Sequence, residues 1–73
     1  MTVSSLLTRS QAATALRHSP IPALRKLVID ESDEAVVIHG TVTSYYLKQL
    51  AQEALMPYLD GRILHNRVAV VRD

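Results

Sequence analysis

The sequence predicts an α+β domain, built as a helix-and-sheet (α/β) sandwich. An apolar strand-like run over residues 36–42 precedes an amphipathic segment that begins near Ser44, and a second strand-like run over residues 63–71 follows. A strand, a helix and a strand in succession form a crossover that places both strands in one sheet with the helix on a face. The chain has 73 residues and no linker or internal repeat, so we expect one domain over residues 1–73.

The first part of the chain predicts one helix. Ser4 or Ser5 can cap a helix that runs to about His18, with an apolar stripe along one side. Residues 19–22 hold two prolines, which cannot donate to a preceding turn, so the helix ends there. A short helical turn over residues 23–26 can follow.

A hairpin is expected next. Residues 27–29 are apolar and β-branched, the acidic group Glu31 to Glu34 is polar, and Val36 begins the next strand. Two strands this close in sequence must run antiparallel. The acidic hairpin from Asp30 to Glu34 lacks the length and the glycine of a calcium loop, so we expect a solvated turn.

The segment from Ser44 predicts the clearest helix. Its apolar residues recur with helical spacing and form one wide stripe: Leu47, Leu50, Ala51, Ala54, Leu55 and Tyr58. Pro57 should stop regular helix near Met56, and the pair Asp60-Gly61 supplies a turn before the last strand.

Ten residues in these elements form a pattern that is similar to that of a known family. The residues concerned are Gly40, Val42, Leu50, Ala51, Ala54, Gly61, Leu64, His65, Asn66 and Val70. In this pattern the chain resembles the BON domain family over roughly residues 12–71. The resemblance implies the order αββαβ, with two helices packed on one face of a three-stranded mixed sheet. Arg62 departs from it, because the family usually has an apolar residue after the second glycine.

The resemblance also implies a function. Members of the family are thought to attach to phospholipid or to bind envelope ligands, so we expect a non-enzymatic binding module with an anionic phospholipid or a protein as partner. Four basic residues precede the first acid in the chain and are the candidates for contact with lipid headgroups: Arg9, Arg17, Arg25 and Lys26. Each contributes about 1 kcal/mol near an anionic surface, so the expected attachment is marginal and sensitive to salt.

The alternative is a protein-interaction or homodimerisation module that acts through the sheet. If both helices cover one face, period-two alternation leaves a set of side chains on the other face: Val28, Val37, His39, Thr41, His65, Arg67, Ala69 and Val71. The free edge of the last strand would offer a second docking route by strand addition.

Several chemistries find no support. The chain has no cysteine, and His39 and His65 lack a third residue to complete a metal site. No serine lies in a nucleophile motif and no acid–base pair stands out, so we expect neither an enzyme nor a cofactor. Gly40 and Asn66 are better explained by packing and by hydrogen bonding between segments than by ligand contact.

Nucleic acid and membrane insertion are also disfavoured. The formal net charge is only +1, and the strands carry no aromatic residue on which bases could stack. The start of the chain lacks the apolar run of a secretory signal, and no run is long enough to span a membrane. Its acid-free composition superficially matches a transit peptide, but Ala12, Ala13 and Leu16 better fit a buried helix stripe. The default expectation is a cytoplasmic or membrane-peripheral protein.

Overall fold

The computed structural model describes residues 11–72. A helix over residues 11–17 is followed by α2 (Pro22–Arg25), β1 (Val28–Glu31), β2 (Ala35–Val42), α3 (Tyr45–Leu55), the 3-10 helix η1 (Met56–Tyr58) and β3 (Ile63–Val70). The predicted start of the first helix at Ser4 or Ser5, and the lipid candidate Arg9, lie outside the described residues. The remaining order agrees with the prediction, with α2 as the expected short turn.

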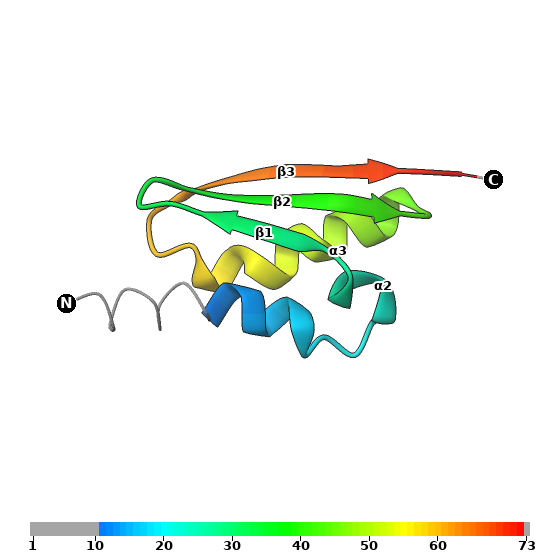
Figure 1. The fold of residues 1–73 in the computed structure, drawn as a ribbon, viewed down its shortest axis with the longest axis horizontal. Coiled ribbons are helices and arrows are strands. Elements are labelled where there is room, and N and C mark those ends of the chain that lie inside the picture. The colour runs from blue at the N-terminus through cyan, green and yellow to red at the C-terminus, as the bar shows by residue number, and fades with distance from the viewer. Residues whose placement is uncertain (1–10, 73) are drawn as a thin grey trace.

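The three strands form one mixed sheet in the order β1-β2-β3. β1 pairs antiparallel with β2 as a hairpin, and β3 pairs parallel with β2 after the α3 crossover. All the helices lie on one side of the sheet, as Figure 1 shows. Among residues 11–72 nothing packs on the opposite side, which we call the open face. The predicted arrangement of helices on a single face is therefore confirmed.

Local chemistry explains where α3 begins and ends. The hydroxyl of Ser44 accepts a hydrogen bond from the backbone N–H of Leu47 at 3.2 Å, which satisfies one of the unpaired donors of the first turn. Pro57 follows the last residues of α3, and the chain tightens there into η1. This change of helix type leaves Tyr58 exposed, so the predicted apolar stripe ends at Leu55.

The core between the sheet and the helices is aliphatic. Its buried members are Ala12, Leu16, Leu24, Leu27, Val36, Ile38, Val42, Ala51, Leu55 and Val68. The strand residues among them alternate with residues of the open face, as the period of a strand requires. The core therefore fixes which side chains of the sheet remain available to a partner.

Candidate functional site

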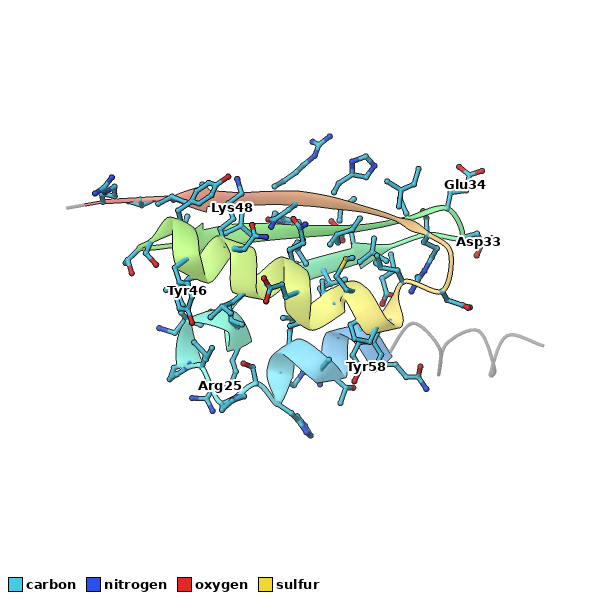
Figure 2. All side chains as sticks on the ribbon, turned by 180° about the vertical axis from the view of Figure 1, so that it is seen from behind. Arg25, Asp33, Glu34, Tyr46, Lys48 and Tyr58 are labelled. Atoms are coloured by element: carbon cyan, nitrogen blue, oxygen red, sulfur yellow. The ribbon has the colours of Figure 1, made fainter. Side chains whose placement is uncertain are left out.

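One end of the domain gathers cations and tyrosines. Arg25 and Lys26 lie at the end of α2, and Tyr45 and Tyr46 begin α3, with 71% and 70% of their surfaces exposed. α2 contacts α3, and Arg25 and Tyr46 lie at the same end of the domain in Figure 2. Arg17 shares a surface pocket with Arg25, and Arg72 shares another with Tyr45. We call this set the basic end: Arg17, Arg25, Lys26, Tyr45, Tyr46 and Arg72.

The acidic residues of the hairpin lie at the other end of the molecule. In Figure 2, Arg25 and Tyr46 are at one end of the long axis, while Asp33 and Glu34 are at the other. Residues 11–29 and 40–52 contain no acid at all. The domain is thus electrically polar along its length although its formal net charge is only +1.

A pocket of about 250 Å³ lies where the first helix, α2 and β1 meet. Arg17 and Arg25 line it together with apolar side chains, among them Leu16 and Leu27. Among the described residues, no carboxylate lies within ion-pair distance of either guanidinium. A pocket with two unpaired guanidinium groups beside apolar side chains is suited to a ligand that carries an anionic group next to an apolar one.

The open face carries the residues that alternation predicts. The register pairs Val28 with His39, and it pairs Val37, His39 and Thr41 with His65, Arg67 and Ala69. Val71 continues the alternation one residue beyond β3, where its N–H donates to the carbonyl of Val42 at 2.8 Å. Asp30 and Ile63 belong to the same face by the same alternation and were not among the predicted residues.

The histidines of the open face do not form a metal site. His39 Nε2 lies 2.9 Å from Asp30 Oδ2 in an exposed pair on neighbouring strand positions. His65 is diagonal to His39 across β2 and β3. Within residues 11–72 no group of three His, Cys, Asp or Glu side chains is placed to hold an ion.

Arg62 and Glu31 overturn the prediction of a wholly solvated acidic turn. Arg62 NH1 donates to Glu31 Oε1 at 2.9 Å, and the side chains of Arg62 and Glu31 are only 9% and 7% exposed. The guanidinium also donates to the carbonyl of Leu59 at 2.8 Å and to that of Tyr58 at 2.9 Å. One buried charge pair therefore ties the β1–β2 hairpin to the turn before β3, and the residue that departs from the family pattern performs this role.

Three residues of the BON-like pattern, Gly40, Gly61 and Asn66, have structural roles. Asn66 donates to the carbonyl of Lys48 at 3.0 Å and accepts from the N–H of Val68 at 3.2 Å, which ties β3 to α3. Gly61 adopts φ 83° in the turn after η1. Gly40 has φ 136° and lies directly against Leu27. None of the three lines either of the two surface pockets described above.

A scan against protein-family models finds no match, and searches of curated proteins and of solved structures also find none. The resemblance to the BON family thus stays a prediction, while the fold that it implies is observed. Within the described part of the chain, every helix is too short or too polar to cross a bilayer.

Sequence reasoning found part of the basic end and missed the rest. Arg17, Arg25 and Lys26 stand out because no acid precedes them. Tyr45, Tyr46 and Arg72 join them only through the fold, since α3 begins and β3 ends at the same end of the domain. The available signal was the pair of adjacent tyrosines at the start of a helix whose apolar stripe does not include them.

Proposed function

We propose that this chain is a non-enzymatic binding module that attaches peripherally to anionic phospholipid surfaces through its basic end. The observation that carries the proposal is the joint presence of four cations and two highly exposed tyrosines at one end of a domain whose formal net charge is only +1. Tyrosine is enriched at the headgroup level of membranes, and basic side chains are attracted to anionic leaflets.

The expected affinity follows from the number of cations. Four basic residues at about 1 kcal/mol each supply about 4 kcal/mol, which corresponds to a dissociation constant near 1 mM. The tyrosines add contact with the interface. Attachment should therefore be weak, reversible and screened by salt, because the attraction falls off within a Debye length of about 10 Å at 0.1 M salt.

The test is cosedimentation with vesicles of phosphatidylglycerol mixed with phosphatidylcholine, compared with phosphatidylcholine alone. We expect binding only to the anionic vesicles, and strong loss of binding between low and high salt. Lys26→Gln should weaken binding about fivefold, because it removes about 1 kcal/mol of attraction.

The matched control is Arg67→Gln, which removes one positive charge from the open face rather than from the basic end. It should leave vesicle binding nearly unchanged. Equal losses in Lys26→Gln and Arg67→Gln, equal binding to neutral vesicles, or no binding at low salt would each contradict the proposal.

A second candidate function is self-association through the open face. The observation that favours it is the exposure of three apolar side chains there: Val28, Ile63 and Val71 are each at least half exposed. The Asp30–His39 pair and Arg67 lie on the same face, and their charges would lose hydration in a dimer. We therefore rank self-association below the membrane function.

Sedimentation equilibrium tests the second candidate. Its signature would be a dimer that Ile63→Lys dissociates and that Met56→Lys leaves intact, since Met56 is a similarly exposed apolar residue but lies on η1. A monomer across the accessible concentration range removes this candidate and leaves the membrane proposal untouched.

A further inference from the structure

We propose that the groove between β1 and the first helix binds an extended peptide that ends in a free α-carboxylate, by adding it as a fourth strand. This inference goes beyond membrane attachment, since it assigns a protein partner of defined chemistry to a groove that shares Arg17 and Arg25 with the basic end. Three features of the groove carry it: a free strand edge, a pocket with two unpaired arginines at one end of that edge, and acids at the other end.

The first feature is the free edge of β1. β1 is the outer strand of the sheet and pairs only with β2 among the described strands. The N–H of Ser32 donates to the carbonyl of Ala35 at 2.8 Å, so Ser32 faces β2. Antiparallel pairing alternates, and the backbone groups of Ile29 and Glu31 therefore point away from β2. Their N–H and C=O groups are the ladder that an added strand needs.

The second feature is the pocket at the start of β1. Arg17 comes from the first helix and Arg25 from α2, and both line the pocket beside Val28 and Ile29. A carboxylate held by guanidinium groups forms strong charge-assisted hydrogen bonds. Leu16 and Leu27 supply apolar wall for the last side chain of the peptide. The volume of about 250 Å³ is below the roughly 300 Å³ at which small-molecule sites begin, so it suits one terminal residue.

The third feature sets the direction and the charge of the peptide. With its carboxylate at the start of β1, the peptide runs antiparallel to β1, and its upstream residues reach the hairpin. Each strand residue advances about 3.3 Å, so the acids at the hairpin lie about four residues from the pocket. Glu34 is exposed there, beyond the end of β1. The partner that complements both ends of the groove has a basic residue about four positions before an apolar, carboxylate-terminated end.

Fluorescence anisotropy with a labelled hexapeptide, Thr-Lys-Val-Thr-Val-Leu with a free carboxylate, tests the proposal directly. We expect the amidated peptide to bind about tenfold more weakly or worse, because a lost hydrogen bond between charged groups is worth a factor of that size. N-methylation of a peptide amide that pairs with β1 should abolish binding, whereas N-methylation of the next amide should not.

Variants of the protein locate the site. Arg17→Gln and Arg25→Gln should each weaken peptide binding about tenfold, because each removes a charged donor from the pocket. Lys26→Gln is the matched control: it removes the same charge from the residue next to Arg25 and does not line the pocket. It should change peptide binding less than twofold. All three residues are exposed, so the fold should survive, and an amide spectrum of each variant checks this.

The outcomes separate this inference from the membrane proposal. Amide shifts at Ile29 and Glu31 on addition of the peptide support the groove. Equal binding of the free and amidated peptides overturns it, as does an equal loss in Lys26→Gln and Arg17→Gln. No binding of the peptide at 1 mM also overturns it, and vesicle binding can persist in each of these cases.

Discussion

At the scale of single residues, Gly40 shows how one backbone conformation organises the packing around it. Its φ of 136° lies in a region of backbone conformation that residues with a Cβ atom rarely adopt. A Cβ built on Gly40 would lie 2.8 Å from Cδ2 of Leu27, a buried core side chain. Leu27 lies one residue before β1, so the absence of a side chain on Gly40 lets the start of β1 pack directly against β2.

Gly40→Ala should lower the free energy of unfolding by about 3 kcal/mol. Backbone strain of about 1–3 kcal/mol and overpacking of a similar size both oppose the new methyl group. Gly61→Ala is the matched control, because Gly61 also has positive φ but a Cβ there meets nothing within 4 Å. It should cost only about 1 kcal/mol. Urea unfolding of both variants measures the difference, and equal losses would show that Leu27 yields without cost.

The sequence predicts that Gly40 allows close packing, but it does not predict which residue packs against it. Glycine inside an apolar strand indicates close packing or a bulge, and packing was the favoured interpretation. Leu27 as the contact could not be foreseen, because it depends on the register between β1 and β2.

At the scale of elements, the buried pair of Arg62 and Glu31 holds the hairpin against the turn that follows η1. The guanidinium meets a carboxylate of β1 and the carbonyls of two residues at the end of the helical segment. The pair therefore joins elements that are distant in sequence.

Glu31→Gln should destabilise the domain by about 3 kcal/mol, because removal of one partner leaves the other charge buried without compensation. Asp30→Asn makes the same chemical change one residue earlier, in the exposed pair with His39, and should cost less than about 1 kcal/mol. Thermal unfolding resolves the contrast, since 1 kcal/mol shifts the midpoint by about 4–8 °C in a domain of this size. Similar shifts in the two variants would mean that water reaches the Arg62 pair.

The elements themselves followed from the sequence far better than this link did. Period-two alternation located β2 and β3, and the leucine–alanine stripe with Ser44 and Pro57 located α3. Arg62 and Glu31 lie on opposite sides of a crossover, and no local pattern pairs them. Glu31 also belongs to an acidic run whose other members are exposed, so composition alone predicts that it is solvated.

At the scale of the whole molecule, the separation of charge along the long axis determines how the domain meets a charged surface. The basic end and the hairpin tip are at opposite ends of the domain (Figure 2). A domain polarised in this way should orient as well as bind, because an anionic surface attracts one end and repels the other.

Single-cysteine labelling tests that orientation, and the absence of native cysteine makes it simple. A polarity-sensitive fluorophore on Thr43→Cys, which is exposed just before α3, should shift to the blue on anionic vesicles. The same fluorophore on Glu34→Cys, at the hairpin tip, should stay in water and show no shift. Equal shifts at both positions would contradict a fixed orientation at the membrane.

The parallel pairing of β2 with β3 also governs how the chain reaches this fold. A hairpin such as β1–β2 can form in microseconds because its strands are neighbours in sequence. By contrast, β3 can pair with β2 only after α3 has packed across the sheet. We therefore expect the pairing of β3 with β2 to be the slow step of folding. Until β3 pairs with β2, the backbone N–H and C=O groups along that edge of β2 have no partner. Two folding molecules can exchange strands through this edge.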